Sequence, residues 1–374
     1  MDQVVRSHTL SLGIVGIPNA GKSSLFNALT KKSVPAENFP FCTIDKNVGV
    51  VEIPDERLKK MSNFFDADKI VPSVMTFVDI AGLVKGASQG EGLGNQFLSH
   101  IREVDVIVYV LRAFSSTEIV HVYNRVDPVD DFEIVQSELI FKDLEVVEKK
   151  LANVIRNSKS GITRDSQLQI SVLERILKGL NEGIPVIDMK FTDEERDFVT
   201  QLWLLTSKQR LFLLNCKEGL DEKEISLWEK RLMEISGDTK GDFVVRVDIK
   251  LLSDLANMTD EEINEYVELL GGKPVSVEDI IKYAYNRLNL ITFYTGSKKE
   301  CNAWTIESGA NVKSAAGVIH TDLEKNFITA DVVNVDEMID IGGWSKAKEV
   351  GLVKNHGKEY VVRDGDYIVI LANA

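Results

Sequence analysis

The segment Gly16–Ser23 constrains the fold of this chain more than any other part of its sequence. It matches the pattern G-x-x-x-x-G-K-S, in which glycines let successive backbone N–H groups point at phosphate oxygens. The apolar run Ser11–Gly16 leads into it, and Ser23–Leu29 follows with helical periodicity. A strand, a glycine-rich turn and a helix N-terminus together form the setting in which such a loop binds a nucleoside triphosphate. A turn without chemistry does not explain this placement.

Further apolar runs predict an α/β domain around this loop. They are short and bounded by polar residues, and the central one has the β-branched character of a buried parallel strand. The runs are Val48–Ile53, Ser73–Val78, Val104–Leu111, Leu211–Leu214 and Phe243–Val247. We therefore expect a P-loop G-domain with a predominantly parallel sheet, formed by residues 1–130 and 207–285.

Residues 131–206 lack strand signals and carry two helical stripes. Apolar residues recur there at spacings of three and four, in the sets Ile140, Leu144, Val147, Leu151, Val154 and Ile170, Leu173, Leu177, Leu180. A polar stretch with Gly161 separates the two sets. Two such helices bury their stripes against each other, so we predict an inserted antiparallel helical hairpin. The alternative is a pair of helices lying along the main domain.

The last part of the chain, residues 286–374, is rich in β signals. Strand-like runs occur at Leu290–Tyr294, Ala303–Ile306, Phe327–Val333 and Tyr367–Leu371, with one helix near Lys313–Val318. The Asp364-Gly365 pair within Val361–Tyr367 predicts a tight hairpin. We expect a small, separate β-rich domain.

Composition limits the class of protein. The chain has 374 residues, 44% of them hydrophobic, and a net charge of −14. Its acidic balance argues against steering onto nucleic acid, so we expect no sequence-specific DNA binding. Three widely spaced cysteines fit neither a disulfide framework nor a zinc site. No apolar run reaches the roughly 18 residues that cross a bilayer. These observations predict a cytoplasmic protein that does not enter membranes.

Five positions carry the expected phosphate and metal chemistry. Within the loop, Lys22 would reach the β- and γ-phosphates and the Ser23 hydroxyl would bind Mg²⁺. Asp79 ends an apolar strand and is followed by Gly82, the Asp-x-x-Gly arrangement in which the carboxylate holds Mg²⁺ through water. The Gly82 amide would then sense the γ-phosphate, so Lys22 and Gly82 are the expected catalytic groups. Thr43 is the expected switch threonine on Mg²⁺, with a solvated loop threonine as the alternative.

Two residues bear on the rate of hydrolysis. Leu83 follows Gly82, where Ras-like enzymes carry a glutamine that positions the attacking water. Leucine cannot do this, so we expect slow hydrolysis or help from another group. Asn19 offers a side-chain carbonyl beside the phosphates, where it would help bind K⁺ and so supply positive charge. The alternative for Asn19 is a structural role in the loop. A third residue, His100, is expected to be a surface or packing residue.

The residues that follow Leu211–Leu214 select the base. Guanine-specific proteins carry Asn-Lys-x-Asp there, whereas this chain has Asn215-Cys216-Lys217-Glu218. Cys216 and Glu218 break the guanine clamp, and main-chain groups around Cys216 are suited to the adenine edge. We therefore expect ATP as the substrate, with a degenerate guanine site as the alternative.

These motifs resemble the YchF or Obg-like ATPase family along nearly the whole chain. The resemblance lies in the segments Gly13–Ser24, Asn38–Thr43, Phe77–Asn95, Ala303–Ile306 and Ile319–Ile328. It implies a G-domain with a helical coiled-coil insertion and a C-terminal, ubiquitin-like TGS domain. It also implies preference for ATP through Asn-x-x-Glu, which Asn215 and Glu218 match, and a link to ribosomes, translational control and stress.

The resemblance also assigns individual residues. It implies phosphate contacts by Asn19, Ala20, Gly21, Lys22, Ser23 and Ser24, Mg²⁺ ligation by Ser23 and Thr43, and an adenine contact by the Cys216 backbone. The chain departs from the family pattern in two places. Tyr109 stands in the strand where a histidine of some members has been considered catalytic, and the late loop reads Val247-Asp248-Ile249-Lys250.

We therefore expect a slow Mg²⁺-dependent ATPase, with K⁺ as a second cation, acting as a nucleotide-dependent switch at the ribosome. Two alternatives stay open. One is a GTPase of ribosome assembly, and the other is a non-catalytic regulator that docks on the ribosome or RNA. We expect the chain to be a monomer.

Overall fold

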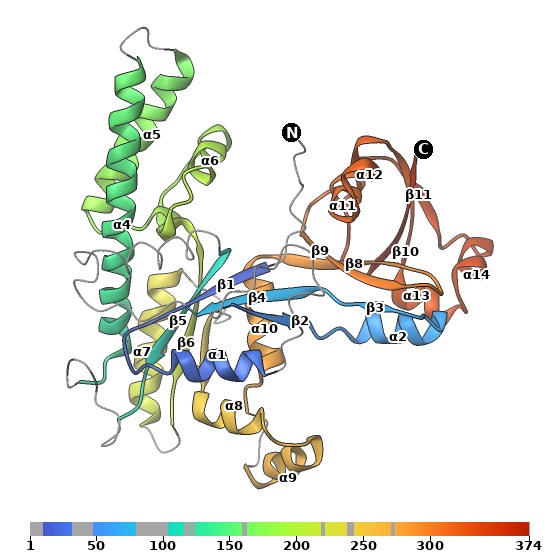
Figure 1. The fold of residues 1–374 in the computed structure, drawn as a ribbon, viewed down its shortest axis with the longest axis horizontal. Helices are drawn as coiled ribbons and strands as arrows, with labels where there is room; N and C mark the ends of the chain where they lie inside the picture. The colour runs from blue at the N-terminus through green and yellow to red at the C-terminus, as the bar shows by residue number, and fades with distance from the viewer. Residues whose placement is uncertain are drawn as a thin grey trace.

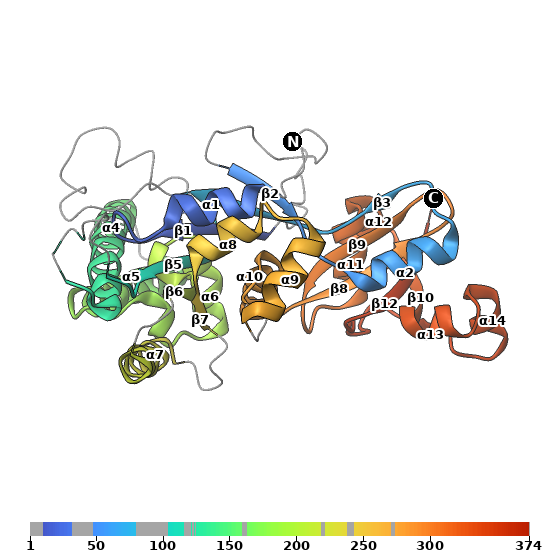
Figure 2. The ribbon, with the colours of Figure 1, turned by 90° about the horizontal axis from the view of Figure 1, so that it is seen from below.

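The computed structural model describes residues 10–31, 48–79, 104–115, 121, 123, 125–158, 163–217, 221–237, 243–270 and 274–373. Two six-stranded sheets dominate it, and a helical hairpin projects from the first of them (Figures 1 and 2). Among the described residues, no helix is both long enough and apolar enough to span a bilayer.

The first sheet has the strand order β2-β4-β1-β5-β6-β7 and is parallel except for β2, which runs antiparallel to β4. Its strands are β1 (Leu10–Val15), β2 (Val48–Glu52), β4 (Val74–Asp79), β5 (Val106–Arg112), β6 (Gln209–Asn215) and β7 (Val244–Val247). All seven residues of β5 are buried, as expected of a central strand covered on both faces. The predicted parallel α/β sheet is thus confirmed.

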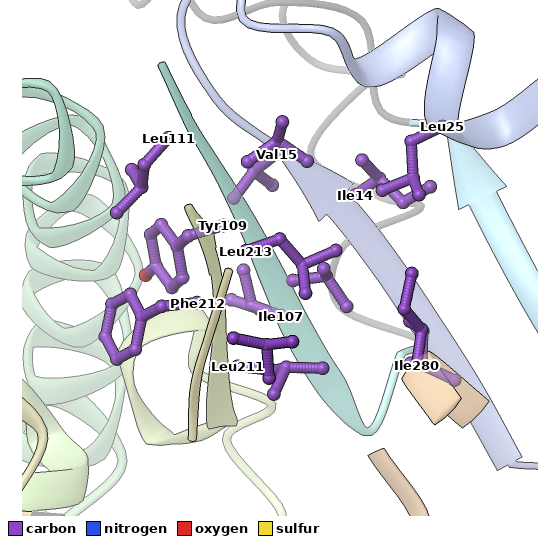
Figure 3. Close-up of a cluster of buried hydrophobic side chains, with 14 of the residues drawn as sticks. Ile14, Val15, Leu25, Ile107, Tyr109, Leu111, Leu211, Phe212, Leu213 and Ile280 are labelled. Carbon is purple, nitrogen blue, oxygen red and sulfur yellow. The ribbon is translucent and has the colours of Figure 1, made fainter. Parts of the chain in front are cut away.

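Helices cover both faces of this sheet. On one face lie α1 (Lys22–Thr30), α8 (Ile249–Leu255) and α10 (Val277–Arg287), and on the other lie α4 (Pro128–Asn157) and α7 (Glu222–Ser236). Figure 3 shows the division: Leu25 and Ile280 lie on the first side, whereas Tyr109 and Phe212 point toward α4. Because strand side chains alternate, neighbouring residues of β5 and β6 serve opposite faces of one core.

The predicted hairpin is confirmed and has its own core. Helices α4 and α5 (Arg164–Asn181) pack side by side and project from the sheet (Figure 1). The first half of α4 buries Phe132 and Leu139 in the core of the sheet, while its second half joins α5 and α6 (Asp193–Thr200) in a separate apolar cluster. The Asp143 carboxylate accepts hydrogen bonds from the backbone N–H groups of Leu205 and Thr206 at 2.8 and 2.7 Å. This contact ties the return segment to α4.

The C-terminal domain is a mixed sheet with the strand order β11-β10-β12-β8-β9-β3. Its own elements are β8 (Leu290–Gly296), β9 (Cys301–Glu307), α11 (Val312–Ile319), α12 (Thr321–Lys325), β10 (Phe327–Asn334), α13 (Val335–Asp340), α14 (Trp344–Glu349), β11 (Lys354–His356) and β12 (Asp366–Ala372). Helix α11 occupies the expected helical region near Lys313–Val318, α12 was not expected, and the β-rich character is confirmed.

The hairpin predicted at Val361–Tyr367 is wrong. Gly365 does adopt a positive φ of 91°, and the Asp366 N–H donates to the Arg363 carbonyl, so a turn forms there. Val361, however, makes only an isolated bridge with Asn311, while β12 pairs with β10 and β8. The strand before the turn was thus assigned to the wrong partner, because local turn chemistry does not specify which strands pair.

The sixth strand of the C-terminal sheet comes from the first domain. Strand β3 (Ile70–Val71) pairs in parallel with β9, and α2 (Glu56–Phe65) packs on the same sheet. Both elements lie in sequence between β2 and β4. We call residues 53–73 the α2–β3 arm. From the sequence, these residues are expected in the G-domain, whereas Leu58 and Met61 lie in the core of the C-terminal domain.

Met61 supplies a test of this arrangement. Its side chain is fully buried in the cluster that contains Tyr294 and Met338. We expect Met61→Ala to lower the free energy of unfolding of the C-terminal domain by about 3 kcal/mol, because the truncation leaves a cavity. Hydrogen exchange of β10 and β12 measures the effect, with Lys59→Ala on the exposed side of α2 as the control. Faster exchange confined to β5 and β6 would contradict the assignment.

Candidate functional site

The phosphate loop begins where β1 ends, and two of its glycines are required by close contacts. Gly16 has φ 156°, and a Cβ there would lie 2.5 Å from the Val110 carbonyl oxygen of the neighbouring strand. Gly21 has φ 108°, and a Cβ there would lie 2.7 Å from Asn215 Nδ2. Any larger residue would push the loop away from β5 and β6. The glycines therefore hold the loop against the carboxyl edge of the sheet, where ligands of open α/β sheets bind.

A cavity of about 560 Å³ opens above this edge. Residues from four segments that are distant in sequence line it: the loop and α1, the end of β5, the end of β6, and the start of α8. The lining residues are Asn19, Gly21, Lys22, Ser23, Ser24, Phe114, Asn215, Lys217, Asp248, Ile249, Lys250, Ser253 and Asp254. All the predicted loop contacts except Ala20, which is buried beneath the loop, are thus brought together around one cavity.

Lys22 is a buried cation within this site. Only 7% of it is exposed, and its Nζ donates to the Ile17 carbonyl oxygen at 2.8 Å. Burial lowers the pKa of Lys22 to about 8, and the nearby Asp79 carboxylate opposes part of that shift. A desolvated ammonium interacts strongly with an incoming phosphate, because little water competes for its charge. Its position fits the role predicted from the sequence.

Asp79 fits the expected Mg²⁺ position. It ends β4 directly beside β1, in register with Ile14. Its Oδ1 is buried and has no hydrogen-bond partner among the described residues, and burial raises the pKa of the carboxyl group while Lys22 lowers it. The Asp79 carboxylate and the Ser23 hydroxyl are the kind of hard oxygen ligands that Mg²⁺ prefers. The other predicted ligand, Thr43, and the predicted γ-phosphate sensor, Gly82, lie outside the described residues.

Asn215 fastens three segments of the site together. Its Nδ2 donates to the Ala20 carbonyl at 2.9 Å, and its Oδ1 accepts from the Ile249 N–H at 3.2 Å. The side chain is 5% exposed. The amide therefore links the end of β6 to the phosphate loop and to α8. The sequence predicted a base contact for Asn215, and the structure shows its side chain in this supporting role.

The side of the cavity that the sequence leads us to expect for the base is formed around Phe114, Asn215 and Lys217. Lys217 Nζ lies 5.0 Å from the centre of the Phe114 ring, and the Arg112 guanidinium lies 4.6 Å from it. The Cys216 N–H donates to the Val247 carbonyl at 2.9 Å. An adenine contact by the Cys216 backbone therefore falls to its carbonyl group, which would accept from the exocyclic amine. Glu218 lies outside the described residues.

Asn19 has a backbone conformation that few residues adopt. Its φ is 64°, a left-handed value that asparagine tolerates better than most side chains. The residue is exposed and lines the cavity. This position allows the proposed K⁺ contact and equally satisfies a structural role in the loop.

Tyr109 does not take part in the site. It is fully buried between Phe132 and Phe212, and its hydroxyl donates to Gln136 Oε1 at 3.1 Å. Burial raises the pKa of Tyr109 beyond its usual range. The residue faces α4, away from the cavity side of the phosphate loop (Figure 3). It is a core residue, so it is no candidate for activating water.

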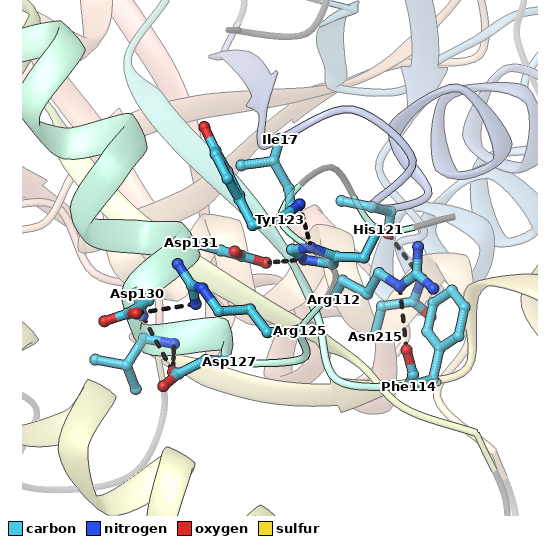
Figure 4. A network of polar contacts seen from close by, with 12 residues as sticks. Ile17, Arg112, Phe114, His121, Tyr123, Arg125, Asp127, Asp130, Asp131 and Asn215 are labelled. Carbon is cyan, nitrogen blue, oxygen red and sulfur yellow. Dashed lines mark hydrogen bonds and ion pairs between the residues drawn. The ribbon is translucent and has the colours of Figure 1, made fainter. Parts of the chain in front are cut away.

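A buried polar pair that was not predicted from the sequence lies near the end of β5. His121 and Asp131 are 6% and 1% exposed, and His121 Nε2 lies 3.1 Å from Asp131 Oδ2 (Figure 4). His121 Nδ1 accepts from the Tyr123 N–H, so the Nε2 proton is the one shared with Asp131. Burial raises the pKa of Asp131, and the hydrogen bond from His121 opposes that shift. The pair fixes the first turn of α4, and the signal for it was a single histidine just before the Asp127-Pro128 helix start.

The depressed pKa of Lys22 predicts a pH effect in nucleotide-free protein held in chelator. Between pH 8 and about 10, the folded state releases the Lys22 proton while the unfolded chain retains it. The unfolded state then binds more protons, so stability rises with pH across this window. We expect the stability of the wild type relative to Lys22→Met to increase from pH 8 to 10 in chemical denaturation. A constant difference would contradict the burial of a titrating ammonium.

A phosphate loop at the carboxyl edge of a parallel sheet, with a buried lysine and a carboxylate facing it, defines a P-loop nucleotide hydrolase. Comparisons with known proteins agree. Residues 11–150 match a family described as 50S ribosome-binding GTPase, and residues 290–373 match YchF-GTPase_C, described as a protein of unknown function (DUF933).

Relatives match nearly the whole chain. The chain is 43% identical to a Bacillus subtilis protein named ribosome-binding ATPase YchF, over 96% of this chain and 98% of that protein. It is 42% identical, with the same coverage, to the Escherichia coli O157:H7 protein of that name. The solved structure of the Schizosaccharomyces pombe YchF GTPase superposes with a TM-score of 0.80 at 36% identity, covering 97% of this chain and 98% of that one. The chain belongs to the YchF family.

Proposed function

We propose that the protein is an ATPase that hydrolyses ATP slowly with Mg²⁺ and acts as a nucleotide-dependent switch at the ribosome. The observation that carries the hydrolase part is the buried Lys22 ammonium facing Asp79 at the phosphate loop. The ribosome enters through the names of the bacterial relatives, which describe ribosome-binding ATPases.

We assign each residue a proposed role from its position in the site. Lys22 and the loop amides stabilise the charge that spreads over the transferring phosphoryl group. Ser23 and Asp79, with Thr43, would hold Mg²⁺, which would neutralise charge on the β- and γ-phosphates. Gly82 is proposed to sense the γ-phosphate. Leu83 supplies no side-chain polar group for orienting water, which is the reason for a slow intrinsic rate.

The preference for ATP rests on the base side of the cavity. The Lys and Asp of the guanine motif are replaced by Cys216 and Glu218, and the Cys216 N–H is already donated to Val247. Its carbonyl accepts a hydrogen bond and therefore suits the amino group of adenine, whereas guanine presents a carbonyl at the same ring position. The second candidate is a GTPase, because the fission yeast relative is named as one.

Competitive titration of ATP against GTP tests this preference, in potassium and in sodium buffers. We expect ATP to bind at least about tenfold more tightly, an advantage of roughly 1.4 kcal/mol. If Asn19 helps hold K⁺, hydrolysis should be faster in potassium than in sodium, and Asn19→Ala should remove the difference. Tighter binding of GTP by tenfold would overturn the proposal, and equal rates in the two buffers would overturn the K⁺ assignment alone.

We further propose that the protein works in the cytoplasm as a monomer. Sedimentation with ribosomes in ATP and in ADP tests the partner. If the protein is a nucleotide-dependent switch, the fraction of it that sediments with ribosomes should differ between ATP and ADP. If it is a non-catalytic docking protein, that fraction should be the same with both nucleotides and in the Lys22→Met variant.

A further inference from the structure

The α2–β3 arm leaves the first sheet between β2 and β4, and β4 carries Asp79 of the candidate site. Strands β2 and β4 are antiparallel neighbours, with Glu52 opposite Val74, and the Ile53 N–H continues the ladder by donating to the Ser73 carbonyl at 2.8 Å. The two strands thus form a ribbon that is closed by the arm at one end. At the other end of β4, about 17 Å away for a strand of this length, lies Asp79. The ribbon connects the phosphate end of the site to the arm.

Apolar packing holds the arm in the C-terminal domain. Leu58 and Met61 of α2 are buried in a cluster whose other members come mainly from β8, β9, β12 and α13. The Phe65 and Tyr367 rings stack with their centres 6.0 Å apart. Figures 1 and 2 show α2 lying with the C-terminal elements, far from α1. The arm therefore lies in the sequence between two strands of the first domain, while its apolar side chains are buried in the C-terminal domain.

Backbone hydrogen bonds extend this attachment. Strand β3 pairs with β9, the Cys301 N–H donates to the Lys69 carbonyl at 3.0 Å, and the Asp68 N–H donates to the Lys298 carbonyl at 2.9 Å. The Ser73 hydroxyl donates to the Ala303 carbonyl at 3.0 Å. Because Ser73 directly precedes β4, its bond joins the start of the β2–β4 ribbon itself to the C-terminal sheet.

Two polar contacts lie where β2 leads into α2. Asp55 Oδ1 accepts from the Leu58 N–H and caps the helix, while its Oδ2 accepts from the hydroxyl of Tyr294 at 2.6 Å. Arg57 Nη2 lies 2.5 Å from Asp364 Oδ2. Tyr294 is 1% exposed, whereas Asp55 is half-buried. These contacts fix the angle at which the arm enters the C-terminal domain.

We propose that the α2–β3 arm couples the nucleotide site to the C-terminal domain, so that ATP and ADP favour different positions of that domain. The inference rests on the proposed binding of nucleotide at the phosphate loop. Lys22 lines the cavity proposed to take the phosphates, whose charge differs between ATP and ADP, and it interacts with the Asp79 carboxylate. Strand β4 would carry any displacement of Asp79 into the arm. Because coupling between sites is reciprocal, loosening the arm must also change how well the site distinguishes the two nucleotides.

Hydrogen exchange on the full wild-type chain tests the coupling without any substitution. It is measured with saturating Mg²⁺–ADP and with a saturating Mg²⁺ complex of a non-hydrolysable ATP analogue. We expect the exchange rates of the Asp68 and Cys301 amides, which join the arm to β9 and to the turn before it, to differ at least about fivefold between the two nucleotides. The β10–β11 pairs at the far edge of the same sheet are the internal control. Equal exchange at Asp68 and Cys301 would overturn the coupling.

A pair of substitutions tests reciprocity. Tyr294→Phe with Arg57→Met removes the two polar contacts at the entry to the arm and keeps its apolar core. We expect the ratio of the ATP and ADP dissociation constants to change by about fivefold, whereas Lys59→Met, on an exposed α2 pair with Glu56, leaves it within twofold. If the double variant unfolds the C-terminal domain, Tyr294→Phe alone is used. Failure of both nucleotides to bind the wild type would overturn the proposed function, whereas tight binding with an unchanged ratio would overturn the coupling alone.

Discussion

Replacing Lys22 by methionine is expected to lower the rate of ATP hydrolysis by about 10²- to 10³-fold, because it removes a preorganised charge from the transferring phosphoryl group. Methionine keeps most of the volume of the lysine stem, so the packing beneath the loop is retained. The ammonium is almost fully enclosed and donates to the Ile17 carbonyl, whereas the other two lysines that line the cavity, Lys217 and Lys250, follow β6 and lie in α8 rather than in the phosphate loop. Single-turnover hydrolysis at saturating ATP measures the effect on the chemical step.

Lys31→Met is the matched control, because Lys31 follows the C-terminal end of the same helix and bonds to Asn257 on the exposed surface. Its rate should stay within twofold of the wild type. A Lys22→Met protein that hydrolyses ATP within tenfold of the wild type would show that the charge is supplied elsewhere, and the catalytic assignment of Lys22 would be wrong.

Asn215→Ala is expected to weaken nucleotide binding by about 10- to 100-fold. The substitution removes two hydrogen bonds of a buried amide and leaves the Ile249 N–H and the Ala20 carbonyl without this partner. Buried polar groups left in that way cost about 1–3 kcal/mol each, and part of that cost appears as loss of the loop geometry that binds phosphate. Titration with ATP and with ADP should show similar losses, because the clamp acts on the loop beneath both.

Asn257→Ala provides the control, since that asparagine lies exposed near α8 and bonds to Lys31. The stability of each variant is measured in parallel, so that weaker binding is read only from folded protein. Affinity within twofold of the wild type in Asn215→Ala would contradict the supporting role assigned to this side chain.

The local sequence was sufficient to predict a feature wherever all the residues that form it lie in one short segment of the chain. The phosphate loop was predicted because the glycines, the lysine and the helix start are neighbours in the chain, and β1 and α1 form as expected around them. The hairpin was predicted because each of its helices has its own apolar stripe. Helix periodicity is a local property, so it survives in any tertiary setting.

Contacts between distant segments were not predictable in this way. The expected role of Asn215 was a base contact, and only the packing of β6 against the loop shows that its side chain supports Ala20 and Ile249. Tyr109 was noted for its place in a strand near the site, but its side chain packs against Phe132 of α4 and therefore lies outside the site. The His121–Asp131 pair joins a loop to a helix, and no spacing rule predicts such a pair.

The sequence by itself determined that this chain carries a phosphate loop on a parallel α/β sheet, because strand, turn and helix propensities act over a few residues. Only the tertiary structure decided that residues 53–73 leave that sheet and complete the C-terminal core. Their apolar stripe shows that α2 is buried but not against which partner, since hydrophobic burial is not directional. The partner is chosen by shape and by the register of β3 on β9, and both exist only once the two domains are folded together.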